Sequence, residues 1–198
     1  ATTSTCLRML VDIAKDHQKK KNQWSFCDIG LGTGILPITA SLMGAFEVEG
    51  FDFDPEALVI ARRNMFINSI DDINIYEQDL FDWSPKKGRT WDVITANIFA
   101  NVLNPNLKKI WSLVSQNGHL LHSGILKDDH GSILENAKNN EFGNFYNQLN
   151  ANTSNQKWLM DYLTKNCAPR MIQICEVSRA RNDRSVVKTC DDFSAYGL

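Results

Sequence analysis

Four residues near the start of the chain, Asp28, Gly30, Gly32 and Gly34, have the types and the spacing of a ligand-binding turn. They follow an apolar stretch that is typical of a buried strand, and a helix-like stretch begins directly after them at Ile35. Glycines allow the backbone to pass close to a ligand and to take positive φ angles. A strand, a glycine turn and a helix in this order bind nucleotide-like cofactors at the carboxyl edge of a parallel sheet.

The spacing of the glycines indicates which cofactor the turn would bind. A dinucleotide fingerprint requires a third glycine where this chain has Ile35, and a phosphate-binding P-loop requires a lysine that the turn lacks. Asp28 at the strand end suits a cationic or hydroxyl-bearing ligand better than a pyrophosphate. S-adenosylmethionine (SAM) fits because it carries an ammonium, a sulfonium and a ribose but no phosphate. The alternative is a tight strand-to-helix turn that binds no ligand.

A second acid, Asp52, favours the same cofactor. It ends another strand-like stretch, residues 47–52, and lies 18 positions after Gly34. In α/β sheets an acid near this distance hydrogen-bonds the ribose hydroxyls. A solvated acid at a strand end is the alternative. Two acids in register with two strand ends nevertheless indicate a SAM site.

Alternating strand-like and helix-like stretches would position these residues. The expected strands are residues 26–29, 47–52, 73–77, 91–96 and 118–122. The expected helices are residues 5–17, 35–43, 55–67 and 105–114. This strict alternation predicts an α/β fold, a parallel sheet with helices on both faces and right-handed crossovers. The length of 198 residues predicts a single domain over residues 1–198.

The last third of the chain has a different pattern. Residues 136–155 are rich in Asn and are predicted to form a loop or an insertion. Residues 156–164 are predicted to be helical. Residues 171–177 and 185–189 are two strand candidates separated by a charged turn, and they predict a terminal hairpin at the edge of the sheet.

The charge and the hydrophobic pattern argue against several classes of function. With 21 Lys and Arg against 23 Asp and Glu, the formal net charge is −2, which argues against a broad nucleic-acid-binding face. The sequence contains no apolar run of the roughly 20 residues that a membrane span needs. The first apolar stretch is short and interrupted by charges, so a signal peptide is not expected.

The cysteines and histidines predict free thiols rather than a metal site. The five cysteines form no C-x-x-C pair, and their odd number indicates unpaired thiols in a reducing cytoplasm. His119 and His122 are three positions apart, and on a strand they would point to opposite faces. We therefore expect a cytoplasmic protein without a metal.

Five stretches of the chain resemble class I SAM-dependent methyltransferases of the PrmA type. They are T-T-S-T-C-L at 2–7, D-I-G-L-G-T-G-I-L at 28–36, G-F-D-F-D-P-E-A at 50–57, A-N-I-F-A-N-V-L at 96–103 and S-G-I-L at 123–126. The glycine run is common to many methyltransferases, whereas the last two stretches are more specific to this type. The resemblance covers residues 2 to about 135 and implies a Rossmann-like, seven-stranded, mostly parallel sheet with an antiparallel strand near the carboxyl end.

The resemblance implies roles for residues on the first two strands. Gly30, Gly32 and Gly34 would line the methionine part of SAM. Asp28 would orient this loop and the ammonium group of the cofactor. Asp52 would bind the ribose hydroxyls.

It also implies roles for residues at the third strand and at the amino terminus. Asp79 would bond the amino group of adenine while Leu80 packs on the ring, although Asp79 could also be a surface loop acid. Thr2 and Thr3 would close over the cofactor. Phe99 could face the sulfonium as a cation–π partner, or it could be a core residue.

Asn97 and Ile98, at the end of the fourth strand, are the candidate catalytic residues. In families with an Asn at this strand end, that residue holds the amino group being methylated and also lies against the cofactor. The Asn97 side-chain oxygen and the Ile98 carbonyl would accept hydrogen bonds from the amine. A helix or turn cap is the alternative for Asn97, and the surrounding N-I-F-A-N run favours catalysis.

The resulting hypothesis is a SAM-dependent N-methyltransferase that acts on a protein amine, for example of a ribosomal protein, as the PrmA type does, and releases S-adenosylhomocysteine (SAH). The family's amino-terminal recognition domain is absent from this sequence, and residues 136–155 have no counterpart in the family. A small-molecule methyltransferase and a non-catalytic SAM-binding subunit therefore stay open as alternatives. An arginine methyltransferase is disfavoured because the fourth strand is not followed by a pair of glutamates, and a nucleic-acid adenine methyltransferase because Ile98 and Phe99 stand where prolines are usual.

Overall fold

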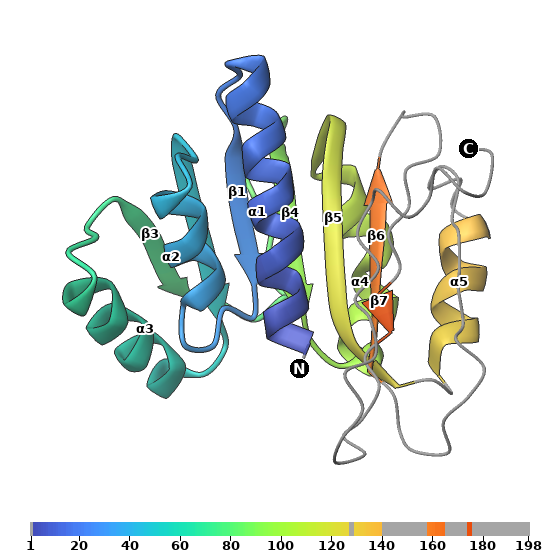
Figure 1. Ribbon diagram of the computed structural model, residues 1–198. Helices are drawn as coiled ribbons and strands as arrows, with labels where there is room; N and C mark the ends of the chain where they lie inside the picture. The colour runs from blue at the N-terminus through green and yellow to red at the C-terminus, as the bar shows by residue number, and fades with distance from the viewer. Residues whose placement is uncertain (1, 127–128, 140–157, 165–173, 176–198) are drawn as a thin grey trace, which may run out of the picture.

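The computed structural model describes residues 2–126, 129–139, 158–164 and 174–175, which form one sheet with helices on both faces (Figure 1). The helices are α1 (Thr2–Lys20), α2 (Ile35–Leu42), α3 (Pro55–Ile67), α4 (Ala100–Ser112) and α5 (His130–Asn139). The strands are β1 (Ser25–Ile29), β2 (Glu47–Asp52), β3 (Ile73–Glu77), β4 (Trp91–Asn97), β5 (Val114–Leu126), β6 (Trp158–Thr164) and β7 (Ile174–Cys175).

The sheet has seven strands in the order β3-β2-β1-β4-β5-β6-β7. Strands β1 to β5 are parallel, β6 is antiparallel to β5, and β7 is antiparallel to β6. The predicted α/β, Rossmann-like fold with a mostly parallel sheet and an antiparallel strand near the carboxyl end is confirmed. The strand order reverses between β1 and β4, and in such folds a crevice opens at the carboxyl ends of the strands that flank this point.

Two hydrophobic clusters fill the space on the two faces of the sheet. The first joins α1, α2 and α3 to one face through side chains such as Leu10, Leu36, Leu58, Phe26 and Val48. The second joins α4 and α5 to the opposite face through side chains such as Leu107, Ile110, Ile133, Cys27 and Ile94. Neighbouring residues of β1 point to opposite faces, which is why a strand buried on both sides appears as a continuous apolar run.

Helix α3 shows how local sequence fixes an element. The Asp54 carboxylate accepts a hydrogen bond from the Glu56 backbone N–H at 2.9 Å, and Pro55 occupies the first turn. An acid at the N-cap followed by proline is a strong start signal for a helix. The predicted bounds, 55–67, are those of the structure.

Helix α4 departs from its predicted range of 105–114. It begins at Ala100, and Pro105 lies inside it. Proline is common at the first helical position, which is where the predicted range has Pro105. Burial of Ala100, Leu103 and Leu107 against the sheet stabilises the additional turn, although Pro105 cannot donate a backbone hydrogen bond there.

The predicted helix over residues 156–164 is wrong, because residues 158–164 form strand β6. The backbone of β6 pairs with β5, with Leu163 opposite Leu120 and Asp161 opposite His122. The edge of β5 would otherwise present unpaired N–H and C=O groups. Satisfying that edge outweighs the weak local preference for a helix.

Other expectations for the last third meet the structure only in part. Helix α5 extends to Asn139, so the predicted loop is wrong for residues 136–139. Asn136 donates to the backbone and side-chain oxygens of Asn104 on α4, at 2.8 and 2.7 Å, which holds α5 in place. Strand β7 lies within the expected strand 171–177. Residues 140–157, the charged turn 179–184 and the expected strand 185–189 lie outside the described residues.

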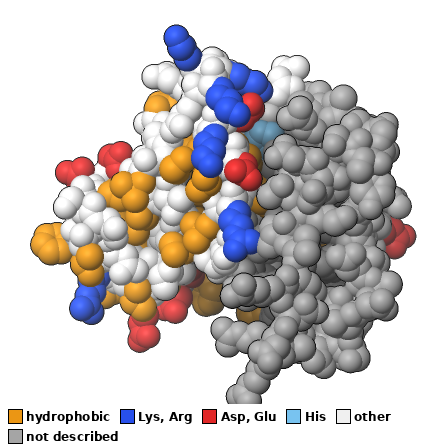
Figure 2. Space-filling view, viewed as in Figure 1, with side chains coloured by type: hydrophobic (Ala, Val, Ile, Leu, Met, Phe, Trp, Pro, Cys, Tyr) orange, Lys and Arg blue, Asp and Glu red, His pale blue; other side chains and the backbone are white. Residues whose placement is uncertain are grey.

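The outer surface of the α1, α2 and α3 layer is mixed in character. Figure 2 shows Lys and Arg side chains along α1 next to acidic ones, and hydrophobic side chains over α2 and α3. The Lys20 and Asp16 side chains of α1 form an exposed ion pair at 2.7 Å. In the part of the chain that the structure describes, the helices are too short or too polar to cross a membrane.

Candidate functional site

The glycine turn after β1 has the backbone that its sequence predicts. Gly30, Gly32 and Gly34 have φ angles of 73°, 53° and 77°, a region that side chains other than glycine rarely adopt. The Gly30 N–H donates to the Phe51 carbonyl at 2.9 Å, which joins the turn to the end of β2. The Gly32 N–H donates to the Asp52 carboxylate, also at 2.9 Å. The two strand ends are therefore locked together.

The three glycines meet different surroundings. A Cβ atom on Gly34 would lie 3.0 Å from the Ala61 Cβ, so this glycine is needed for the packing of α2 on α3. A Cβ on Gly30 would lie 2.5 Å from the Ile98 Cγ2. A Cβ on Gly32 would meet nothing within 4 Å. Gly32 therefore faces open space, while Gly30 leaves room for the loop that follows β4.

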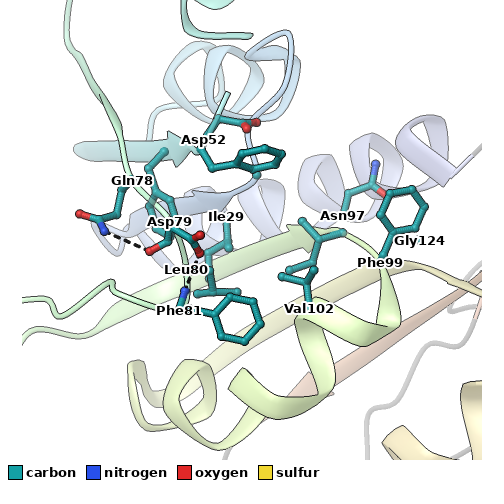
Figure 3. Close-up of a pocket in the computed structure, with 14 residues that line it drawn as sticks. Ile29, Asp52, Gln78, Asp79, Leu80, Phe81, Asn97, Phe99, Val102 and Gly124 are labelled. Atoms are coloured by element: carbon teal, nitrogen blue, oxygen red, sulfur yellow. Dashed lines mark hydrogen bonds between the residues drawn. The ribbon is translucent and has the colours of Figure 1, made fainter. Parts of the chain in front are cut away.

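A cavity of about 560 Å³ opens at the carboxyl ends of β1, β2, β3 and β4. This volume is within the range of small-molecule sites, roughly 300–1,000 Å³. Figure 3 shows Asp52 and Asp79 on one side of the cavity and Asn97, Phe99 and Gly124 on the other. Most lining residues come from the ends of the strands or the loops after them, while Val102 belongs to α4 and Gly124 to β5. The full lining is Ile29, Gly30, Phe51, Asp52, Phe53, Gln78, Asp79, Leu80, Phe81, Asn97, Ile98, Phe99, Val102 and Gly124.

Asp52 is held rigidly at the wall of this cavity. One carboxylate oxygen accepts from the Gly32 N–H, and the other accepts from the Asp54 N–H at 3.1 Å. Each carboxylate oxygen has lone pairs beyond those used here, so both can accept further hydrogen bonds from hydroxyl groups. The side chain is buried, which orders it before any ligand arrives.

The loop after β3 forms another wall of the cavity. The Asp79 carboxylate accepts from the Phe81 N–H at 2.8 Å and so closes a tight turn around Leu80 (Figure 3). The Lys109 ammonium of α4 donates to the carbonyls of Leu80 and Phe81. Burial lowers the pKa of Lys109 from its usual value. This lysine therefore fixes the loop to the helix behind it.

Asn97 lies at the end of β4 in a chain of polar side chains. The Ser123 hydroxyl donates to the Asn97 Oδ1 at 2.7 Å, and the Asn97 Nδ2 lies 3.4 Å from the Thr3 Oγ1. The Cys6 thiol lies 3.4 Å from the Ser123 hydroxyl oxygen. Helix α1 thus reaches the amide of Asn97 from one side and strand β5 from the other.

Asp28 lies beneath the turn rather than in the cavity lining. Its side chain is 1% exposed and accepts a hydrogen bond from the Thr95 hydroxyl. Burial raises the pKa of Asp28 to about 7, while the bond from Thr95 opposes this rise. Asp28 would therefore change charge near neutral pH.

The structure brings most of the predicted site residues together. Of those proposed to bind the cofactor or the amine, seven line the cavity: Gly30, Asp52, Asp79, Leu80, Asn97, Ile98 and Phe99. Phe99 is exposed, so it is not a core residue. Asp28, Gly32, Gly34 and Thr3 lie behind or beside this lining, and Thr3 is connected to it through Asn97. Thr2 belongs to the first turn of α1, and its side chain lies outside the described part.

Some lining residues carried no sequence signal of their own. Phe53, Phe81 and Val102 line the cavity, and each lies close after a predicted strand end or cofactor residue. Their position just after the strand ends was the one feature of the sequence that could have placed them in the site. Ser123 and Gly124 belong to the S-G-I-L stretch, whose role the sequence left open. Their contacts appear only when β5 is placed beside β4.

Most of the chain is similar to known proteins of the type that its sequence resembles. The family model described as ribosomal protein L11 methyltransferase (PrmA) matches residues 1–160. The ribosomal protein L11 methyltransferase of Caldanaerobacter subterraneus subsp. tengcongensis is 36% identical over 137 residues, which are 69% of this chain and 41% of that protein. In eight of the curated relatives the matched part spans 36 to 42% of their length.

Two of the solved structures that resemble this chain illustrate the shared fold. The ribosomal protein L11 methylase of Lactobacillus delbrueckii subsp. bulgaricus has a TM-score of 0.63 at 24% identity, covering 83% of this chain and 79% of that one. A putative methyltransferase complexed with SAH has a TM-score of 0.52 at 13% identity, covering 64% and 40%. The predicted cofactor, SAM, agrees with this fold and this family. The chain belongs to the ribosomal protein L11 methyltransferase (PrmA) family.

Proposed function

We propose that this domain binds SAM in the cavity at the carboxyl ends of β1 to β4 and transfers its methyl group to an amine of a protein. The observation that carries the proposal is the convergence of Asp52, Asp79, Asn97 and Ile98 on one cavity of about 560 Å³. The first two residues offer acids to the cofactor, and the last two offer uncharged acceptors to an amine.

The residues present fit SAM. Asp52 keeps lone pairs for the ribose hydroxyls while the turn and the Asp54 N–H hold it in place. The open space beside Gly32 leaves the backbone accessible to the methionine part of the cofactor. Leu80 offers an apolar surface to the adenine ring, and Asp79 lies beside it. When bound, SAM supplies an electrophilic methyl group on a sulfonium leaving group.

Residues of the chain then have to align the acceptor and keep it uncharged. A free lysine amine has a pKa of about 10.4, so roughly one in 2,500 is neutral at pH 7, which costs about 4.6 kcal/mol. The Asn97 side-chain oxygen and the Ile98 carbonyl accept hydrogen bonds without the charge of a carboxylate, which would stabilise the ammonium form. Holding the amine in line with the methyl group is a contribution of proximity and orientation.

The methyl acceptor that we propose is an amine of ribosomal protein L11, either a lysine or the terminal amine. The support is the family, whose members are named for this substrate. The chain matches about two fifths of the length of these curated relatives. The activity of the full-length relatives is therefore a proposal for this chain.

Tritiated SAM tests the proposal directly. The chain is incubated with tritiated SAM and bacterial lysate, and labelled protein is separated from labelled small molecules. Label in a protein of the size of L11 is expected. Label that appears in new small-molecule products, with none in protein, would contradict a protein acceptor.

Two variants separate the proposed roles. Asn97→Ala is expected to lower turnover more than the affinity for SAM, because Asn97 is assigned to the amine. Asp52→Ala is expected to lower the affinity for SAM sharply. Equal losses of turnover and affinity in Asn97→Ala would make Asn97 a binding residue only, and unchanged affinity in Asp52→Ala would refute the ribose assignment.

A further inference from the structure

The first two residues of the S-G-I-L stretch, Ser123 and Gly124, lie directly against the two candidate amine acceptors. Ser123 is the register partner of Asn97 in the parallel ladder of β4 and β5. Its side chain is fully buried, and its hydroxyl donates to the Asn97 Oδ1 at 2.7 Å. A carbonyl oxygen has two lone pairs, so this bond leaves one for a ligand.

The donor and acceptor of each hydrogen bond in this row of polar side chains fix the orientation of the Asn97 amide. A serine hydroxyl has one proton, and that of Ser123 goes to Asn97, so the Ser123 oxygen accepts from the Cys6 thiol. Burial raises the pKa of Cys6 to about 11, so the thiol keeps its proton at neutral pH. On the other side, the Asn97 Nδ2 faces Thr3. The donor and the acceptor are therefore defined for each of these hydrogen bonds.

Gly124 fixes the position of the Ile98 carbonyl, as Ser123 fixes that of the Asn97 side-chain oxygen. Gly124 has a φ angle of 86°, and a Cβ placed on it would lie 2.7 Å from the Ile98 carbonyl oxygen and 3.1 Å from its carbonyl carbon. On the other side of Ile98, a Cβ on Gly30 would lie 2.5 Å from the Ile98 Cγ2. The backbone of Ile98 is thus held between the cofactor turn and β5, and both neighbours must be glycine.

We propose that Ser123 and Gly124 are positioning residues that set the two acceptor oxygens of the amine site, the Asn97 Oδ1 and the Ile98 carbonyl. The inference rests on the proposed function, because these oxygens matter only if an amine binds there. Neither residue transfers a proton. Ser123 sets the orientation of the amide, and Gly124 provides the room in which the Ile98 peptide lies.

Paired ligands test this inference without knowledge of the methyl acceptor. SAH fills the cofactor site and carries no amine at the methyl position. Sinefungin has an amine at that position, so the ratio of its affinity to that of SAH reports the contact between an amine and the acceptor oxygens. Both affinities are measured by calorimetry on the whole 198-residue chain and on its variants.

The variants are chosen to separate orientation from packing. Ser123→Ala removes the bond to Asn97, and Ser123→Thr keeps a hydroxyl. Ser115→Ala is the matched control, because Ser115 is also on β5 and donates its hydroxyl to an acidic side chain, Asp92, at 2.7 Å. Gly124→Ala perturbs the Ile98 peptide.

We expect Ser123→Ala to lower the preference for sinefungin over SAH roughly tenfold, which corresponds to one hydrogen bond to a charged group, while SAH affinity is unchanged. Ser123→Thr should restore the preference, Gly124→Ala should lower it, and Ser115→Ala should leave it unchanged. A parallel loss of both affinities in Ser123→Ala would overturn the inference, because Ser123 would then be structural.

The result also separates this inference from the proposed function. If the wild-type chain fails to bind SAH, the proposed function itself fails. If the chain binds SAH and Asn97→Ala removes the preference for sinefungin, but Ser123→Ala keeps it, the amine site stands and the positioning roles are refuted.

Discussion

Replacing Asp28 by Asn tests the electrostatics beneath the glycine turn. The Asp28 side chain is 1% exposed, and burial raises its pKa from 3.8 to about 7. Between these two values the folded protein holds a proton that the unfolded chain releases, so the free energy of unfolding falls as the pH rises. At about 1.4 kcal/mol per pH unit, the full fall is about 4 kcal/mol, and about 3 kcal/mol of it lies between pH 5 and pH 8.

Urea denaturation followed by circular dichroism measures this effect at a series of pH values. The relevant quantity is the difference in unfolding free energy between the wild type and Asp28→Asn. His17 and His119 have pKa values lowered mainly by burial, so their titration makes stability rise with pH and opposes the effect of Asp28. Because both proteins contain these histidines, the difference isolates the contribution of Asp28.

We expect the wild type to lose about 3 kcal/mol relative to Asp28→Asn between pH 5 and pH 8. Thr95→Val provides a second test, because it removes the hydrogen bond that lowers the pKa of Asp28. In that variant the fall should move to higher pH. A difference between wild type and Asp28→Asn that is constant with pH would refute the assigned protonation.

Three further outcomes follow from other contacts. Gly34→Ala should lower the free energy of unfolding by about 1–2 kcal/mol or more, because Gly34 has a φ of 77° and a Cβ would lie 3.0 Å from that of Ala61; an unchanged urea midpoint would contradict this. Lys109→Met should weaken SAH roughly tenfold by releasing the loop after β3, and equal SAH affinity by calorimetry would contradict the role of Lys109. The Cys6 thiol should resist alkylation at pH 8 in the folded protein, because it is buried and its pKa is about 11; rapid labelling, located by peptide mass spectrometry, would refute its burial.

The sequence predicts those parts of the fold whose signals are local. Pro55 predicts the start of α3, and the spacing of Gly30, Gly32 and Gly34 predicts a turn with positive φ angles. The acid at the end of β2, Asp52, lies in the cavity lining because parallel strands end at the same edge of the sheet. The predictable site residues are therefore those at the ends of strands.

The parts that could not be predicted depend on contacts between distant segments. Strand β6 exists because β5 has an edge to pair with, and residues 158–164 do not contain that information alone. Pro105 suggests a helix start that burial of Leu103 and Leu107 overrides. The chain from Cys6 through Ser123 to Asn97 joins three elements, so it becomes visible only when α1, β4 and β5 are packed together.

Mass spectrometry of purified bacterial ribosomal protein L11 after incubation with SAM and this chain tests the central claim most directly. The account predicts that the mass of L11 rises by whole methyl increments, and that fragmentation locates them on lysine side chains or on the terminal amine. The Asn97→Ala variant, used at a SAM concentration that gives the same bound fraction as in the wild type, should leave most L11 unmodified. An unchanged L11 mass, under conditions in which calorimetry shows SAM bound to the wild-type chain, would contradict the claim.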